Sequence, residues 1–251
     1  MDSRYIKVLV CHLFCTSVIS TLLNYALLSY SLSLYSNIFN VFLWICVAAF
    51  TFQFTKAKFL NERIESENKA VLITGCDSGF GHSLAKRLDS KGFHVFATCL
   101  FPSSEGATEL KKSCSQRLHV LHVDVTKDDS VKEAVDYVKQ NLGSSEFWAV
   151  VNNAGIIKGF SVELAHINDF KSCLEVNTLG PIRVVKAVMP LLKQSKGRIV
   201  NITSLGGVVA FPYFTPYTTS KYAAVGFTEA LRQEVDIWGI KVISLEPEIF
   251  K

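Results

Sequence analysis

A serine, a tyrosine and a lysine lie in one stretch of the chain at spacings that suit proton transfer. Ser204 precedes Tyr217 by thirteen residues, and Lys221 follows the tyrosine by four. If a helix begins near Tyr217, four residues make about one turn, so the phenol and the ammonium share a face. An ammonium about 4 to 6 Å away lowers the pKa of a tyrosine from about 10 by one to three units. The trio is therefore a candidate acid/base group in which Ser204 holds a substrate oxygen.

A glycine-rich turn supports this interpretation, because the tyrosine and lysine alone would also fit an amphipathic helix with a surface lysine. The apolar run 70–74 leads into Gly75, Gly79 and Gly81 and then into a helical pattern. Glycines suit a turn whose backbone approaches a pyrophosphate, which then sits on the helix N-terminus. A plain tight turn is the alternative, but the position between a strand and a helix favours a dinucleotide-binding loop.

Short apolar runs alternate with helical stretches from residue 70 onward. Repeated strand–helix units with nearly continuous apolar strands predict an α/β fold, a Rossmann-like doubly wound parallel sheet covered on both faces. The expected strands are 70–74, 93–98, 118–123, 148–152, 197–203 and 240–245. The expected helices are 80–90, 130–141, 168–192 and 218–237.

The N-terminal segment carries no Asp, Glu, Lys or Arg from Val8 to Thr55. These residues are more than twice the ~20 that a helix needs to cross a bilayer, and a break near 29–40 divides them into two runs. We therefore expect a membrane anchor of one or two transmembrane helices at 1–60, a linker at 61–69 and the folded domain at 70–251. A cleaved signal peptide is the main alternative. Basic residues at both ends favour a hairpin with both ends cytoplasmic, whereas a single span would reverse this topology.

Charge, cysteine and histidine usage exclude several other classes of protein. A formal charge of +4 without a basic run argues against nucleic-acid binding. Seven cysteines, an odd number with no paired spacing, favour a reducing compartment over a disulfide scaffold. His119 and His122 would point to opposite faces of a strand, so we predict no metal site there. Ser204 lacks a GxSxG setting, which disfavours a serine hydrolase.

The spacing TGxxxGxG over Thr74–Gly81 resembles that of the short-chain dehydrogenase/reductase family. Further stretches match this family in the expected order over residues 70–250: Asp124, Asn152–Gly155, Asn177 and then Ser204, Tyr217 and Lys221. The sequences TGCDSGFG, FWAVVNNAG and KGRIVNITS are most similar to the membrane-bound branch that contains hydroxysteroid, retinol and 3-hydroxybutyrate dehydrogenases.

The resemblance implies a role for each matching residue. Tyr217 would be the acid/base, Lys221 would lower its pKa and hold the nicotinamide ribose, and Ser204 would orient the substrate oxygen. Asn177 would hold a water that links the lysine to solvent, although an ordinary helix-bend residue is the alternative. Asp124 would lie on the adenine, or merely cap the following turn. The implied cofactor-binding residues are Gly75, Asp77, Ser78, Gly79, Phe80, Gly81, Asp124, Val125, Asn152, Ala154, Gly155, Tyr217 and Lys221.

Charge around the glycine loop favours NAD over NADP. A 2′-phosphate calls for a cation beside the loop or at the end of the second strand. Those places hold Asp77-Ser78 and Thr98-Cys99-Leu100, and Asp77 would repel a phosphate. The acidic residue usual about twenty residues further on is also missing from the sequence.

The pattern departs from the family after the sixth strand. The family follows this strand with Pro-Gly, a substrate-covering segment and a seventh strand, whereas here Pro247 is followed by Glu248 and the sequence ends at Lys251. Glu248 would bring a negative charge near the nicotinamide, and the sixth strand would form an exposed edge. We therefore expect either an incomplete sequence of a longer enzyme or a protein that no longer catalyses.

Two hypotheses of different classes follow. The first is an NAD-dependent oxidoreductase of a lipophilic steroid or retinoid alcohol in the endoplasmic reticulum membrane. A 3-hydroxybutyrate-like hydroxy acid and the mitochondrial inner membrane are the alternative substrate and location. The second is a catalytically silent nucleotide-binding or interaction protein that lacks the substrate lid. A homodimer is expected from the resemblance to the family.

Overall fold

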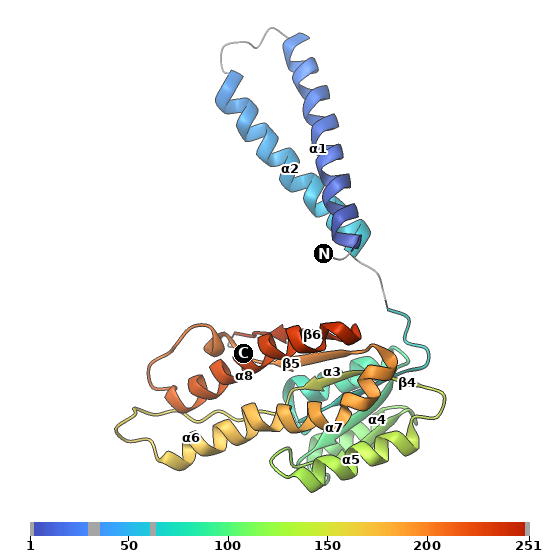
Figure 1. The fold of residues 1–251 in the computed structure, drawn as a ribbon, viewed down its shortest axis with the longest axis vertical. Helices are drawn as coiled ribbons and strands as arrows, with labels where there is room; N and C mark the ends of the chain where they lie inside the picture. Colours follow the sequence, from blue (N-terminus) through green and yellow to red (C-terminus); the bar gives the residue numbers. More distant parts are fainter. Residues whose placement is uncertain (1–2, 30–35, 61–63, 249–251) are drawn as a thin grey trace. The chain divides into compact units, whose positions relative to one another are not determined.

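The computed structural model describes residues 3–29, 36–60 and 64–248. It divides into two compact units, residues 1–65 and residues 66–251 (Figure 1). The first unit consists of helices and the second contains the sheet. Each unit is described by itself.

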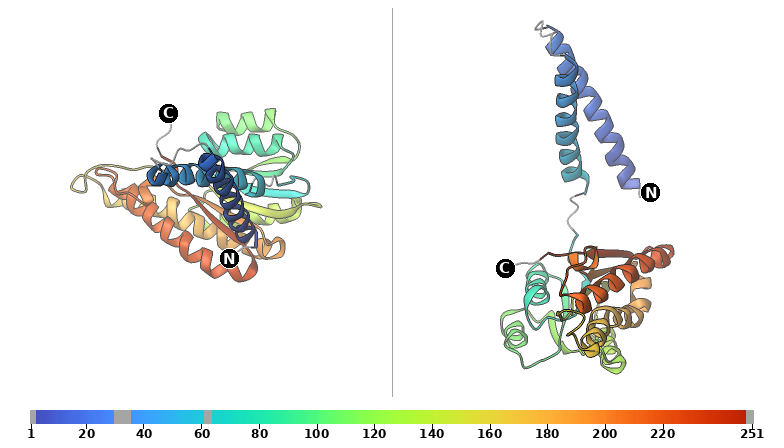
Figure 2. Two further views of the ribbon diagram at one scale, coloured as in Figure 1. Left: turned by 90° about the horizontal axis from the view of Figure 1, so that it is seen from above. Right: turned by 90° about the vertical axis from the view of Figure 1, so that its left-hand side faces the viewer.

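The N-terminal unit is a hairpin of α1 (Ser3–Ser29) and α2 (Ser36–Leu60), which run side by side (Figures 1 and 2). A buried hydrogen bond of 2.8 Å joins the hydroxyls of Thr16 and Thr51, and His12 Nδ1 lies 3.1 Å from the Thr51 hydroxyl. The expected break at 29–40 is too long, because α2 begins at Ser36, and 30–35 lie outside the described residues. Among the helical residues that the structure describes, no helix has both the length and the apolar character of a membrane span.

The second unit is built on a six-stranded sheet with the order β3-β2-β1-β4-β5-β6, in which all neighbours are parallel. This order is that of a doubly wound Rossmann fold, as the sequence predicts. All six expected strands are confirmed to within two residues at either end. The bounds are β1 Lys69–Ile73, β2 His94–Cys99, β3 Leu118–His122, β4 Glu146–Asn152, β5 Arg198–Ile202 and β6 Lys241–Leu245.

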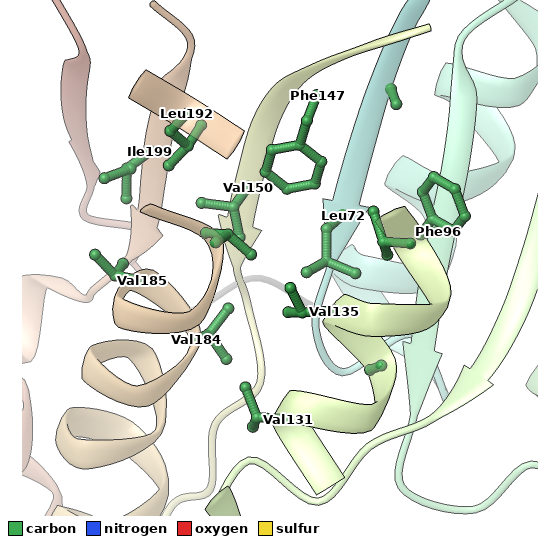
Figure 3. Close-up of a cluster of buried hydrophobic side chains, with 14 of the residues drawn as sticks. Leu72, Phe96, Val131, Val135, Phe147, Val150, Val184, Val185, Leu192 and Ile199 are labelled. Carbon is green, nitrogen blue, oxygen red and sulfur yellow. The ribbon is translucent and has the colours of Figure 1, made fainter. Parts of the chain in front are cut away.

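Helices cover both faces of the sheet (Figures 1 and 2). One face packs against α5 (Asp128–Asn141), α7 (Gly180–Ser195) and α8 (Thr215–Val235), and the other against α3 (Gly79–Ser90) and α4 (Glu105–Ser113). Figure 3 shows the first core, where valines of α5 and α7 meet Leu72, Val150 and Phe96 of the strands. Each such buried side chain contributes roughly 1.5 to 3 kcal/mol, so alternating faces of the apolar strands fix the sheet between two helical layers.

The helices differ from the expected pattern in two places. The helix expected at 168–192 is interrupted, because α6 (Ile167–Leu174) passes through a π-helical turn, η2 (Glu175–Leu179), into α7. The sequence analysis missed α4 altogether, since this helix has only nine residues and mostly polar side chains. Ser104 at the N-cap accepts a hydrogen bond from Ala107 N at 3.2 Å. A serine before a helix is a typical N-cap residue, and this signal in the sequence was overlooked.

Two 3₁₀ turns complete the described elements, η3 (Leu205–Gly207) after β5 and η4 (Asp236–Trp238) after α8. The strand order reverses between β1 and β4. In open α/β sheets, ligands bind outside the carboxyl ends of the strands at this switch point. The predicted site residues follow these strand ends, so the topology explains why they can meet.

Candidate active site

Tyr217 and Lys221 lie on successive turns at the start of α8. Pro216 sits in the first turn of this helix, where a missing amide donor costs nothing. Lys221 is only 6% exposed, and its Nζ donates to the carbonyl of Ile202 at 3.0 Å. The same Nζ lies 5.7 Å from the centroid of the Tyr217 ring. The predicted one-turn spacing therefore places both groups above the end of β5.

Burial alters the acidity of Lys221. Removal from water lowers the pKa of the ammonium to about 8, and the nearby thiol of Cys173 acts weakly in the opposite direction. The ammonium is thus mostly charged at neutral pH but releases its proton far more readily than an exposed lysine does. A group of this kind is suited to proton relay.

Ser204 and Tyr217 lie on either side of Gly206. The serine precedes η3, and its Oγ accepts a hydrogen bond from Gly206 N at 3.0 Å. A Cβ built on Gly206 would lie 3.2 Å from Tyr217 Cε1 and 3.5 Å from Ser204 Oγ. The hydroxyl and the phenol ring therefore border the same small space, so the structure brings the predicted trio together.

The loop that carries Ser204 is held by the last residue of β6 and by the chain that follows it. Thr203 N donates to Leu245 O at 2.8 Å, and Leu205 N donates to Pro247 O at 3.1 Å. These two bonds bracket Ser204 and fix its backbone. Glu248, which the sequence places near the nicotinamide, is exposed.

Asn177 lies at the centre of the π-helical turn and is 2% exposed. Its Oδ1 accepts from Ile156 N at 2.8 Å, and its Nδ2 donates to Ile156 O and to Ser220 Oγ, each at 2.9 Å. The amide therefore joins the segment after β4 to α8. The water-holding role of Asn177 stays a prediction.

Gly155 brings the segment after β4 into the same place. A Cβ on this glycine would lie 3.3 Å from Asn177 Oδ1 and 3.7 Å from Lys221 Nζ. A methyl group there would press on Asn177 Oδ1 and make an ordinary contact with Lys221 Nζ. The residues Gly155, Asn177 and Lys221 thus form one contiguous cluster, as the order of motifs predicts.

The glycine loop after β1 is tied to the segment after β4 by Asn153. Asn153 Nδ2 donates to Thr74 O and Gly75 O at 2.9 Å, and Thr74 Oγ1 accepts from Asn153 N and Ala154 N at 3.0 Å. Gly75 has a φ of 70°, and a Cβ there would lie 2.7 Å from Ala154 Cα. The sequence analysis includes Asn153 only as part of the matched stretch Asn152–Gly155 and assigns it no role of its own, although two consecutive asparagines at a strand end are a visible signal.

The start of α3 fits the pyrophosphate of a dinucleotide. Its N-cap Ser78 makes no side-chain capping bond, and the N-terminus of a helix is a common place for a phosphate group. A Cβ on Gly79 would meet nothing within 4 Å, whereas one on Gly81 would lie 2.4 Å from Gly75 O. The loop is therefore packed tightly at Gly81 and open at Gly79. Phe80, the remaining predicted loop residue, is 55% exposed.

Asn152 is placed differently from the other predicted cofactor residues. Its Nδ2 donates to Asn201 Oδ1 at 2.8 Å, and Asn201 Nδ2 donates in turn to Thr228 Oγ1 at 2.9 Å. This buried chain of amides joins β4, β5 and α8. Asn152 therefore supports the sheet beneath the site.

Asp124 and Val125 follow β3. Burial raises the pKa of Asp124, but hydrogen bonds from the amide and hydroxyl of Thr126 and the charge of Lys127 outweigh it, so the net pKa is lowered. These bonds, at 2.9 and 2.7 Å, make the turn cap that the sequence left open as an alternative. Val125 is buried, and a Cβ on Gly180 of α7 would lie 2.9 Å from its Cγ2.

Two charged groups meet the segment after β2. Asp77 Oδ2 accepts from Leu100 N and Asp77 Oδ1 from Phe101 N, each at 2.9 Å. Lys111, from the unpredicted helix α4, donates from Nζ to Pro102 O at 3.3 Å. Sequence reasoning did not place this cation near the end of β2, because it depends on a helix that the pattern did not reveal.

A family model named short chain dehydrogenase matches residues 69–251. The chain belongs to the short-chain dehydrogenase family. Among curated relatives of this family, the chain is 46% identical to mouse estradiol 17-beta-dehydrogenase 2 over 186 residues, which are 74% of the chain and 49% of the relative. It is 42% identical to human 11-beta-hydroxysteroid dehydrogenase type 2, over 75% of the chain and 47% of the relative.

These matches place this short-chain dehydrogenase in the hydroxysteroid dehydrogenase branch, and the chain spans about half the length of the two relatives. A solved short-chain dehydrogenase from Streptomyces avermitilis superposes with a TM-score of 0.69 at 30% identity, over 74% of this chain and 67% of that one. One from Burkholderia cenocepacia, solved in complex with NADP, superposes with a TM-score of 0.66 at 27% identity, over 75% of each chain.

Proposed function

We propose that this short-chain dehydrogenase is an NAD-dependent oxidoreductase that interconverts a lipophilic alcohol, a steroid or a retinoid, and its carbonyl. The observation that carries the proposal is the convergence of Ser204 and Tyr217 on the two sides of Gly206, with Lys221 beside the phenol ring. A phenol ring and a hydroxyl that border one small space suit the handling of a single substrate oxygen.

Each residue of the trio has a distinct task in the proposed reaction. Ser204 donates its hydroxyl hydrogen to the substrate oxygen and orients it. Tyr217 takes the alcohol proton during oxidation and returns it during reduction. Lys221, buried and fixed to Ile202 O, places a positive charge beside the phenol and favours the anion that forms there. The dinucleotide, when bound, supplies the acceptor or donor of the hydride.

Apolar side chains around the trio support a lipophilic substrate. The loop between Ser204 and Tyr217 exposes large apolar groups, and the segment after β4 exposes more. The two segments meet, since a Cβ on Gly159 would lie 2.8 Å from Tyr213 O and 2.9 Å from Phe214 Cδ1. Exposed apolar area next to a reaction centre favours an apolar ligand over a small hydroxy acid. The exposed residues are Ile157, Phe160, Val162, Leu164, Val208, Val209, Phe211, Tyr213 and Phe214.

The names of the relatives point the same way, because estradiol and other hydroxysteroids are lipophilic secondary alcohols. For the cofactor, the carboxylate of Asp77 at the end of β2 supports NAD. Lys111 is the feature that supports NADP instead, and two of the similar solved structures contain NADP. We propose NAD because the charged group nearest to the end of β2 is the carboxylate of Asp77. This carboxylate bonds directly to the first two residues after the strand.

Location and assembly belong to the same proposal. Phe14, Phe42 and Phe50 of the helical hairpin are each more than 60% exposed, which supports attachment to a membrane. By resemblance to the family, that membrane is the endoplasmic reticulum, with the mitochondrial inner membrane as the alternative. The family resemblance also supports a homodimer, which sedimentation of the purified protein in detergent would test.

Turnover with a matched pair of variants tests the proposed function. We expect the purified chain to bind NADH and to oxidise estradiol or retinol with formation of NADH. Tyr217→Phe should lower kcat about 10²- to 10⁴-fold, and titration of the variant with NADH separates a loss of proton transfer from a loss of cofactor contact. Tyr137→Phe is the matched control, since this tyrosine lies on α5 and contacts His119. Equal rates for the two variants would refute the assignment of Tyr217, and a chain that binds NADH without turnover would favour a silent nucleotide-binding protein.

A further inference from the structure

A carboxylate stands at the carboxyl end of β2, although the sequence supplies no acidic residue there. Asp77 comes from the glycine loop, 23 residues before Leu100 in sequence. Its two oxygens accept the amides of Leu100 and Phe101, the first two residues after the strand, at 2.9 Å each. The carboxylate therefore lies where dinucleotide-binding folds place the acidic residue that follows their second strand.

The position of this carboxylate is fixed by packing as well as by hydrogen bonds. A Cβ on Gly106, in the first turn of α4, would lie 2.1 Å from Asp77 O. Ser104 Oγ lies 3.5 Å from Asp77 Oδ1 while it caps the same helix. The segment 100–106 therefore contacts both the side chain and the backbone of Asp77. A change in the side-chain rotamer of Asp77 would break the hydrogen bonds to this segment.

Asp77 keeps the capacity to bind a ligand in this arrangement. An ionised carboxylate has about four acceptor positions; the two amides occupy two of them and the Ser104 hydroxyl a third, at 3.5 Å, which leaves one position on Oδ2 for a ligand. The residues beside it are open, because Ser78, Gly79, Leu100 and Phe101 are all exposed. A hydroxyl group that approaches from this side meets an acceptor whose geometry is already set.

We infer that Asp77 stands in for the missing acidic residue and accepts a hydrogen bond from the 2′-hydroxyl of the adenosine ribose. This inference rests on the proposed dinucleotide function and names a residue that determines its specificity. The same charge repels a 2′-phosphate, so a single side chain both holds NAD and discriminates against NADP. Asp77 also positions the segment after β2, which forms the remaining wall of this subsite.

Lys111 offers the opposing possibility. Its ammonium is exposed and bonds to Pro102 O, two residues beyond Leu100. A cation there would attract a phosphate from further away. The carboxylate is attached to the strand end itself, whereas the lysine reaches only the following loop, so Asp77 governs the subsite.

Binding of modified dinucleotides to the full chain in detergent tests the inference. The ligands are NADH, NADH without the 2′-hydroxyl of its adenosine ribose, and NADPH, each followed by fluorescence titration. We expect the wild type to prefer NADH over its 2′-deoxy form by about tenfold or more, as for hydrogen bonds to a charged group. In Asp77→Asn this preference should fall to about twofold, and the preference over NADPH should narrow.

Asp89→Asn is the matched control, because Asp89 holds another loop in the same way. It accepts the amide and the hydroxyl of Ser115 at the opposite end of α3. This variant should keep the full preference for the 2′-hydroxyl. Hydrogen exchange at the amides of Leu100 and Phe101, which should quicken in Asp77→Asn alone, reports on the loop independently of any ligand.

The outcomes separate the inference from the function on which it rests. A wild type that binds NADH and its 2′-deoxy form equally would overturn the role of Asp77 but leave the proposed function standing. Unchanged 2′-hydroxyl preference in Asp77→Asn would do the same. A wild type that binds neither NADH nor NADPH would overturn the proposed function and the inference together. A preference for NADPH that Lys111→Ala removes would assign the subsite to the lysine instead.

Discussion

Asn177 donates a buried hydrogen bond of 2.9 Å to the hydroxyl of Ser220, which lies between Tyr217 and Lys221 on α8. Ser220 is fully buried, and its hydroxyl also donates to Tyr217 O at 2.6 Å. The π-helical turn is thus fastened to the first turns of the helix that carries the acid/base pair. A widened turn places the Asn177 amide at the correct height to reach both Ser220 and Ile156.

Removal of the Asn177 amide should loosen this connection. In Asn177→Ala the buried groups of Ile156 and Ser220 lose their partners, and each such loss costs about 1 to 3 kcal/mol. We expect the free energy of unfolding in urea to fall by roughly 2 to 4 kcal/mol. Asn141→Ala is the control, since this half-buried asparagine makes a solvent-exposed bond to Tyr137 O at the end of α5. Equal losses for both variants would contradict the structural role of Asn177.

Two glycine-to-alanine changes should have opposite effects. In Gly81→Ala the added Cβ would lie 2.4 Å from both Gly75 O and Asn153 Nδ2, so the glycine loop must move. Overpacking of this kind costs about 1 to 3 kcal/mol, and NADH binding should weaken with it. In Gly226→Ala the Cβ meets nothing, and the substitution in a helix interior should stabilise the protein by roughly 0.5 to 1 kcal/mol. Thermal melting of the two variants tests the loss and the gain of stability, and NADH titration tests the weaker binding by Gly81→Ala.

The buried ammonium of Lys221 should make stability depend on pH. Its folded-state pKa of about 8 lies below the ordinary 10.5, so folding pays a penalty whenever the amine is charged. This penalty is absent above about pH 10.5, grows as the pH falls toward 8 and stays constant below 8. At 1.36 kcal/mol per pKa unit it amounts to about 3 kcal/mol.

The difference between wild type and Lys221→Met isolates this effect from other titrating groups. The free energy of unfolding of the wild type should rise relative to that of the variant by about 3 kcal/mol between pH 8 and 10.5. Lys112→Met, at an exposed lysine of α4, should run parallel to the wild type over the same range. Parallel curves for Lys221→Met as well would show that the lysine is not desolvated.

Membrane attachment of the helical hairpin is tested by extraction at alkaline pH. If residues 1–60 anchor the chain, the protein should stay in the membrane pellet after carbonate washing of cells that express it. Release into the supernatant would show at most a peripheral association. If the protein stays in the pellet, separation of organelles on a density gradient shows whether it lies in the endoplasmic reticulum or in the mitochondrion.

The sheet was predictable because its strands are short, apolar and regularly spaced. Runs such as Ala70–Ile73, in a chain where short apolar runs alternate with helical stretches, are typical of a strand buried on both faces, and the structure has such a strand there. The trio at Ser204, Tyr217 and Lys221 was also predictable in its proximity, since helical periodicity and the position after a strand end fix it. Such local regularities survive the packing of the whole domain.

Features that depend on packing between distant segments escaped the sequence analysis. The π-helical turn at Glu175–Leu179 leaves no mark in hydrophobic periodicity. Nothing local in the sequence shows that Asp77 serves the end of β2, because the partners are 23 residues apart. Lys111 was overlooked because it lies on α4, a helix that the hydrophobic pattern did not reveal, and the sequence does not show that the Asn152 amide bonds to Asn201 of the neighbouring strand.

The bond from Leu205 N to Pro247 O has a consequence for the order in which the site can mature. A ribosome delivers Ser204, Tyr217 and Lys221 well before it delivers Pro247. A nascent chain that has already emerged as far as α8 therefore lacks the strut that fixes the serine loop. We therefore expect the serine loop to reach its final geometry only after β6 has paired with β5.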